Sequence, residues 1–307
     1  MSTNPLFSYD EGIDQRTVHD RVLLITLGAY ADAGGVQRQL DEHLRNNLAS
    51  REIGRFDTDQ VIDYRDNRPV IDFAGDRYAN YREPTLLLRE FTDKAGEPFL
   101  LLSGPEPSLQ WERVAATINR IVDELDVELV VTAQGMPMPV PHTRPVGLFN
   151  FATDPKLLLI DQPSGHFQMS SSFTGLLAVR MEQAGNHLLG LLAHVPQYLS
   201  DTDYPQAVIA MIDALGKATG LKLPIGALPA AATFVRGQID GQLRQSDELS
   251  EMVRGLEQRY DAYQERRAVA AEAQANLPGG DEIAAEAEAF LASLDSSGDH
   301  GGPAPTA

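Results

Sequence analysis

Short runs of apolar residues alternate along the chain with longer stretches in which apolar residues recur every three or four positions. Continuous apolar runs are typical of strands that are buried on both faces of a sheet. The sequence therefore predicts four buried strands, each followed by a turn or loop that contains glycine or proline. These strands are expected at Arg21–Leu27, Glu97–Ser103, Val127–Ala133 and His187–His194.

The stretches with helical spacing lie between or after these strands. An apolar stripe of this kind is one face of an amphipathic helix, and Ser108 is a suitable N-cap for the second helix. The predicted helices are Val36–Leu48, Leu109–Leu125, Phe173–Gln183 and Tyr204–Thr219. Two shorter apolar segments, Val61–Tyr64 and Val70–Phe73, suggest a pair of short strands in a hairpin.

Strands that alternate with helices over about 200 residues are typical of an α/β fold with a mainly parallel sheet between helices. We therefore expect a three-layer αβα sandwich. In such sheets a ligand crevice lies outside the carboxyl ends of the strands. The loops near Gly28, Ser103, Gly135, Ser170 and His194 are accordingly expected to converge on one edge.

The character of the chain changes after about Pro229. A long, charged helix is predicted over Leu243–Ala275, with a narrow apolar seam that is suited to docking on another surface. A second helix from Asp281 to Leu294 would complete a C-terminal helical hairpin. The expected organisation is a core domain at 1–228, a helical extension at 229–295 and a disordered tail at 296–307, rich in Ser, Gly and Pro.

Composition narrows the classes of function. The chain has no cysteine, which excludes disulfides and cysteine-ligated zinc. Its formal charge is −19 and it has no run of Lys and Arg, so nucleic acid is not an expected partner. No apolar stretch approaches the roughly 20 residues of a membrane span, and the first ten residues lack the features of a secretion signal. A cytoplasmic protein without a membrane partner is expected.

The first candidate for chemistry is the glycine-rich turn Gly28–Gly35, between a strand and a helix. Its N–H groups are suited to an anion, but a tight turn that needs positive φ explains the glycines better. Asp32 is a candidate base, metal ligand or helix cap, and capping is favoured. The second candidate is Ser103 with Glu106 after the second strand, as a nucleophile or as turn residues. Ser103 lacks the flanking glycines of a nucleophile elbow.

The third candidate is the proline-rich segment Gln134–Pro145, which is interpreted as a stiff loop. It carries Gln134, His142 and Arg144. A stiff loop presents polar groups at low entropic cost. Arg144 is suited to holding a carboxylate or phosphate, and equally to bracing the loop or meeting another subunit.

His194, at the end of the fourth strand, is the last candidate. With His142 it would supply acid–base chemistry near neutral pH, although a hydrogen-bonded structural histidine is the commoner arrangement. No histidine stands four residues from another metal ligand, so no metal site is expected. His166 and Ser170–Ser172 precede a predicted helix, where the serines are suited to capping. The sequence identifies no cofactor.

Three of these motifs resemble the PAC2 (proteasome assembly chaperone 2) family in its actinobacterial branch. They are GAYADAG at 28–34, GMPMPVPHTRP at 135–145, and AHVPQYL at 193–199 followed by Tyr204 and Pro205. The resemblance covers about residues 15–290, and the middle motif is the most specific.

The resemblance implies a fold similar to purine nucleoside phosphorylases and hydrolases, and homo-oligomers, with a trimer favoured. It transfers no catalytic residues. Eukaryotic relatives are chaperones of proteasome α-ring assembly, and some use a C-terminal hydrophobic–tyrosine–aromatic tail, which Gly302–Ala307 lacks. Two functions follow as expectations. The first is a homo-oligomeric binding or assembly protein with a protein partner, in which the late helices supply subunit contacts. The alternative is a hydrolase or transferase acting on a small anionic metabolite in the cleft.

Overall fold

The computed structural model describes residues 5–18, 20–28, 32–160, 165–166 and 168–275. The chain divides into two compact units, Met1–Arg254 and Gly255–Ala307. In the second unit the described residues, 255–275, all belong to helix α7 (Asp247–Ala275). The second helix of the predicted C-terminal hairpin and the predicted tail lie outside the described residues.

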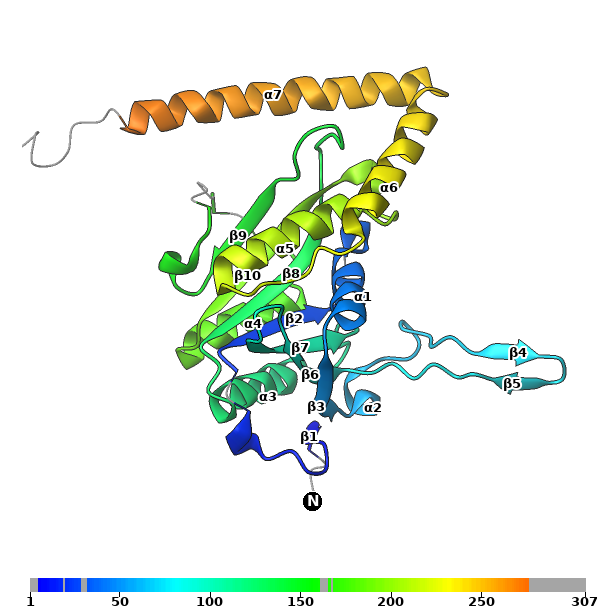
Figure 1. Ribbon diagram of the computed structural model, residues 1–307, viewed down its shortest axis with the longest axis vertical. Coiled ribbons are helices and arrows are strands. Elements are labelled where there is room, and N and C mark those ends of the chain that lie inside the picture. The colour runs from blue at the N-terminus through cyan, green and yellow to red at the C-terminus, as the bar shows by residue number, and fades with distance from the viewer. Residues whose placement is uncertain (1–4, 19, 29–31, 161–164, 167, 276–307) are drawn as a thin grey trace, which may run out of the picture. The chain divides into compact units, whose positions relative to one another are not determined.

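A mixed eight-stranded sheet forms the centre of the first unit (Figure 1). Its order is β1-β3-β6-β7-β2-β8-β10-β9. The four central strands, β7, β2, β8 and β10, are parallel, and they are the four strands that the apolar runs predict. Antiparallel strands flank them on both sides. The strands are β1 (Phe7–Tyr9), β2 (Val22–Leu27), β3 (Ser50–Phe56), β6 (Leu87–Thr92), β7 (Pro98–Gly104), β8 (Leu129–Met138), β9 (Leu148–Ala152) and β10 (Leu188–Pro196).

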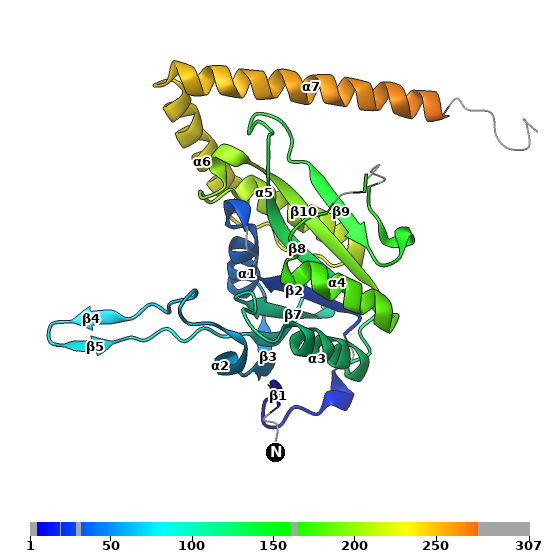
Figure 2. The same ribbon diagram turned by 180° about the vertical axis from the view of Figure 1, so that it is seen from behind.

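Helices cover both faces of the sheet, which confirms the αβα sandwich. Figure 1 shows α1, α5 and α6 over one face, and Figure 2 shows α3 and α4 over the other. The first-unit helices are α1 (Val36–Asn47), α2 (Thr58–Val61), α3 (Trp111–Glu124), α4 (Phe173–Ala184), α5 (Pro205–Thr219) and α6 (Leu228–Leu243). Short 3₁₀ turns lie at Gln15–Thr17, Ala33–Gly35, Pro155–Leu157 and Gln197–Leu199.

The hydrophobic core is split by the sheet into two clusters. In β2, Leu24 faces the α1 and α5 side, while Leu23 and Ile25 face the α3 and α4 side. Successive side chains of a strand point to opposite faces, so a strand between two helical layers must be apolar at every position. This is why β2 appears in the sequence as an uninterrupted apolar run.

The predicted hairpin of Val61–Tyr64 and Val70–Phe73 is wrong in its position. Val61 ends the short helix α2 and is completely buried, and the hairpin strands are β4 (Asp72–Ala74) and β5 (Arg77–Ala79). The two apolar segments resemble each other in sequence, but only the first packs into the core. The second leaves Val70 exposed on the hairpin, a difference that tertiary packing decides.

Ser108 does not cap α3, contrary to the prediction. The residue before the helix is Gln110, in the left-handed conformation at φ 58° and without a capping side-chain bond. Gln110 Nε2 instead donates to Gln60 O at 2.6 Å, and Ser108 Oγ accepts from Asn67 Nδ2 at 3.0 Å. Both side chains therefore tie the start of α3 to the segment around α2.

The first part of the predicted loop Gln134–Pro145 is strand, whereas residues 139–145 lie outside any strand, as predicted. β8 continues to Met138 and stays in parallel register with β10, with Pro137 opposite Val195. Its pairing with β2 ends at Thr132, so beyond this residue β8 has no neighbouring strand on the β2 side. The Gly135 N–H is directed to Asp32 instead. Pro137 lies two residues further and faces the same unpaired side, where a missing N–H costs no ladder bond.

Helix α6 separates the predicted core from the long helix. It contacts α5, and Leu228, Ala232 and Ile239 are buried on it. α7 then begins at Asp247, close to the predicted start. The predicted domain boundaries at residues 228 and 295 stay predictions.

Candidate functional site

The first unit contains a cavity of about 690 Å³ at the carboxyl end of β8, on the face covered by α3 and α4. Strand ends, the start of α3 and the segment before α4 enclose it. Its location matches the crevice that is expected outside the carboxyl ends of parallel strands. The lining residues are Glu106, Trp111, Gln134, Gly135, Met136, Pro137, Met169, Ser170, Ser171, Ser172 and Leu192.

Glu106 supplies the only charged side chain among these lining residues. Its Oε1 accepts a hydrogen bond of 2.7 Å from the backbone N–H of Phe173, the first residue of α4. Gly104, two residues earlier, has φ 148°, and a Cβ there would come within 2.4 Å of Thr85 O. Only glycine fits this close turn, which directs the chain after β7 toward α4.

A second polar group comes from the end of β8 and the start of α4. Ser172 caps α4, because its Oγ accepts from Gly175 N at 3.2 Å. Thr174 Oγ1 lies 2.9 Å from Ser172 Oγ and 3.5 Å from Gln134 Oε1. The predicted cap at Ser170–Ser172 is thus confirmed, and Gln134 is brought to the same helix end.

The apolar side of the cavity is formed mainly by Trp111, Met136, Pro137, Met169 and Leu192. The Trp111 ring packs edge-on against Phe173 at 6.0 Å between ring centroids. Met169 is 78% exposed and lies at the rim. The cavity therefore joins a mostly apolar wall to a few polar groups, which is the usual composition of a small-molecule site.

The glycine-rich turn has the structural role that the sequence favours. Gly34 and Gly35 have φ values of 69° and 58°, and their N–H groups donate to Ser200 O and Asp32 O. Asp32 accepts from the N–H groups of Gln37 and Arg38 in the first turn of α1. Burial raises the pKa of Asp32, and the hydrogen bonds that it accepts partly offset this rise.

His142 is buried among three elements away from the cavity lining. The backbone N–H of His142 donates to Tyr198 Oη at 2.8 Å, and its ring Nδ1 lies 2.7 Å from the same oxygen. Its ring Nε2 lies 3.2 Å from Asp240 Oδ1 of α6. We call His142, Tyr198 and Asp240 the His142 cluster. It connects the segment after β8 to the turn after β10 and to α6.

The remaining predicted residues are placed separately. Arg144 contacts Thr143, with Nη1 and Oγ1 3.4 Å apart. Ser103 is buried in β7 beside Thr26 of β2. Gly28 follows β2, and its N–H donates to Gly104 O.

His194 lies in β10 opposite Met136, and burial lowers the pKa of its imidazole. Of the seven candidates, Gly28, Asp32, Ser103, Gln134, His142, Arg144 and His194, only Gln134 belongs to the cavity lining. The others stay predictions as binding residues.

The described part of the chain shows neither a metal-ligand cluster nor a membrane-spanning helix. No group of three or more His, Cys, Asp or Glu side chains there is arranged to hold a metal ion. Within those same residues, no helix has the length and apolar character needed to cross a membrane.

The strand-end location of the cavity and the sandwich around it agree with the family that the motifs resemble. The chain matches the PAC2 family over residues 26–243. It belongs to the PAC2 family. No protein with a curated function matches this chain.

Solved structures with this fold include three bacterial proteins. A Mycobacterium tuberculosis protein of unknown function is 32% identical, with a TM-score of 0.82, over 88% of this chain and 94% of the other. A PAC2 family protein from Streptomyces avermitilis is 27% identical, with a TM-score of 0.67, over 76% and 100%. A proteasome-assembly chaperone homologue from M. tuberculosis is 24% identical, with a TM-score of 0.69, over 76% and 99%.

Proposed function

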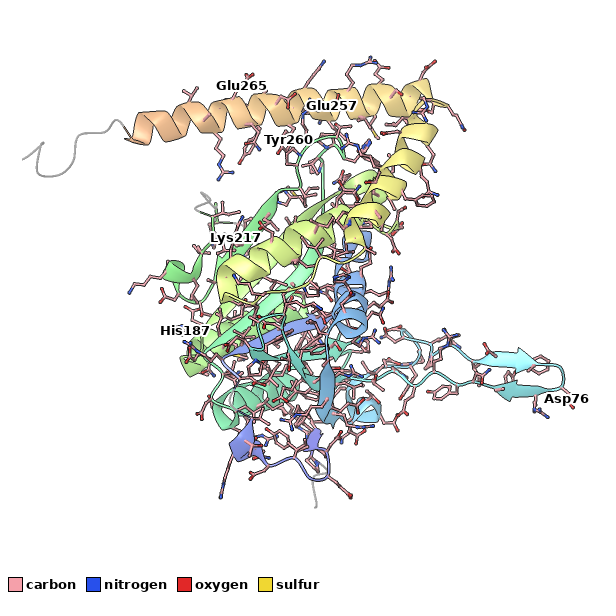
Figure 3. The ribbon with its side chains drawn as sticks, viewed as in Figure 1. Asp76, His187, Lys217, Glu257, Tyr260 and Glu265 are labelled. Carbon is pink, nitrogen blue, oxygen red and sulfur yellow. The ribbon has the colours of Figure 1, made fainter. Side chains whose placement is uncertain are left out.

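We propose that this chain is a self-associating, chaperone-like assembly protein, and that copies bind one another through the β4–β5 hairpin. The exposure of large apolar side chains on this hairpin carries the proposal. The segment 68–82, called the arm below, contains both strands. Figure 1 shows the arm standing away from the sheet, and Figure 3 labels Asp76 at its tip.

Large apolar side chains lie close together along the arm and are open to solvent. Such clusters on a folded protein mark interaction surfaces more often than scattered single residues do. Phenylalanine and tyrosine are also enriched where protein partners contact each other. The exposed fractions are 55% for Val70, 45% for Ile71, 65% for Phe73, 72% for Tyr78 and 54% for Tyr81.

The arm is ordered by contacts along its own length. Phe73 and Tyr78 are cross-strand neighbours, with ring centroids 5.3 Å apart in an edge-to-face arrangement. Asn80 Nδ2 donates to Asp72 Oδ2 at 2.9 Å, and Arg82 N donates to Val70 O at 3.0 Å. A two-stranded hairpin is marginally stable alone in water. Packing against a partner would bury its apolar side chains and stabilise it.

The charge of the arm favours a second copy as that partner. The arm has three arginines, at 68, 77 and 82, against two aspartates, whereas the whole chain carries a formal charge of −19. Among the residues that the structure describes, these arginines form no ion pair. Arginine on an aromatic-rich surface is a common anchor at interfaces, and the acidic surface of another copy complements it.

The family relationship supports the same class of function. One structural neighbour is named a proteasome-assembly chaperone homologue, and the family resemblance favours a trimer. The alternative of a hydrolase or transferase for a small anionic metabolite gains no support from the cavity. Its lining, among the described residues, includes no basic side chain.

Replacing Phe73 and Tyr78 together by Ser tests the proposal by light scattering. The unmodified chain should have the mass of two or more chains of 33.5 kDa each, and the double variant should approach the mass of a single chain. Removal of the two rings deletes the largest apolar contacts of the arm, and hot-spot residues of this kind dominate binding free energy.

A matched control replaces Val179 and Phe234, which are 47% and 66% exposed outside the arm, by Ser. The control should keep the mass of the unmodified chain. An unmodified chain that is already monomeric, or an arm variant that keeps the full mass, would contradict self-association through the arm.

A further inference from the structure

We infer that the strand-end cavity binds a small organic cation, an amine with an aromatic or aliphatic body. The inference is independent of self-association through the arm. It rests on the charge, shape and chemistry of the cavity lining, and it reverses the sign of the ligand that the sequence suggests.

The size of the cavity fits a small molecule. Its volume of about 690 Å³ lies inside the range of roughly 300–1,000 Å³ that is usual for small-molecule sites. Its lining residues all belong to one compact unit and come from β8, β10, the start of α3 and the segment before α4.

Charge selects the head group of the ligand. Glu106 is acidic, and no Lys, Arg or His belongs to the described lining. An anion entering the cavity would lose its hydration and meet a carboxylate without a compensating cation, which is costly. An ammonium group would instead form a charge-assisted hydrogen bond with Glu106.

The position of Glu106 leaves capacity for this bond. One oxygen, Oε1, accepts the Phe173 N–H, which fixes the direction of the carboxylate. An ionised carboxylate accepts up to about four hydrogen bonds. The side chain is therefore held in place by the helix end and still able to receive an N–H from a ligand.

The apolar wall selects the body of the ligand. The indole of Trp111 lines the cavity, and cations are attracted electrostatically to aromatic rings. Met136 and Met169 add polarizable thioethers, which contact aromatic rings favourably and adapt to different shapes. Gln134 and the hydroxyls of Ser170–Ser172 then provide uncharged hydrogen-bonding groups around the head.

Trp111 also provides a direct measurement, because it is the only tryptophan of the chain. Its fluorescence can be titrated with three probes of matched size: 2-phenylethylamine, 2-phenylethanol and phenylacetate. At pH 7 the amine is a cation, as the side-chain amine of lysine is. We expect half-saturation by the amine at a concentration at least about tenfold lower than by the alcohol, with phenylacetate weakest.

Glu106→Gln should reduce the preference for amine over alcohol to within about threefold, because the amide keeps an acceptor for Phe173 N but loses the charge. Glu83→Gln makes the same chemical change at an exposed site and should keep the full preference. Equal or tighter binding of phenylacetate, no response of Trp111 to any probe, or an unchanged preference in Glu106→Gln would overturn the inference. The comparison of probes on the unmodified chain does not depend on any variant folding.

Discussion

The His142 cluster and the strand-end cavity both lie near the carboxyl end of β8, yet their polar groups are arranged in opposite ways. In the cluster, both ring nitrogens of the buried His142 have protein partners. In the cavity, Glu106 has one protein partner and faces a volume large enough for a ligand. Polar groups that are fully satisfied stabilise the fold, whereas polar groups with remaining capacity are available to a ligand.

The largest expected difference between these regions is in stability. His142→Ala should lower the free energy of unfolding by about 1–3 kcal/mol, because the buried ring and its hydrogen bonds to Tyr198 Oη and Asp240 Oδ1 are lost. Chemical denaturation measures this change. Glu106→Gln should stay much closer to the unmodified chain.

In ligand titration the same two variants should exchange places, since Glu106→Gln should lose the preference for an amine and His142→Ala should not. His142→Ala should keep the preference of the cavity for an amine, since its side chain is outside the lining. A loss of that preference in a folded His142→Ala protein would show that the two regions act as one site.

A smaller effect is expected at His194, which lies in β10 beside the cavity residue Met136. Because burial lowers the pKa of His194 below its ordinary 6.5, the unfolded chain binds the proton more readily than the folded chain. The stability from neutral His194 is present above pH 6.5. It is lost as the pH falls from 6.5 toward the pKa of the folded state.

Unfolding at a series of pH values measures this effect. His194→Gln should remove up to about 1.4 kcal/mol per pH unit from the slope below pH 6.5. The exposed His187, labelled in Figure 3, supplies the control. An identical change of slope in His187→Gln and His194→Gln would contradict the assignment to burial.

The fold could be predicted where strands are buried on both faces. β2, β7, β8 and β10 appear as continuous apolar runs for this reason. The outer strands β3 and β6 do not appear as apolar runs, because charged residues stand between their apolar ones. For example, Arg51 of β3 pairs with Glu90 of β6 across the sheet. In addition, the register between these strands shifts between Glu52 and Gly54, which obscures the alternation expected of a half-buried strand.

The site could be predicted only in part. Gln134 follows from its place at the end of a strand, and the crevice follows from the parallel sheet. Glu106 is interpreted from sequence as a turn residue, and Trp111 lies inside the predicted helix Leu109–Leu125, because the helix whose start completes their site begins 67 positions after Glu106. His142 is a functional candidate from sequence because its structural partners, Tyr198 and Asp240, lie 56 and 98 positions away in the chain. No local sequence pattern predicts these contacts.

Because the chain has no cysteine, a single introduced thiol can report on the proposed role of the arm. Ala74→Cys places a thiol on β4 and keeps every large side chain of the arm, while Ala184→Cys places one on the exposed end of α4. The measurement is the rate of maleimide labelling of each variant at increasing protein concentration. Self-association through the arm predicts that labelling at residue 74 slows as concentration rises, while labelling at 184 does not change. Equal, concentration-independent rates at both positions would contradict it.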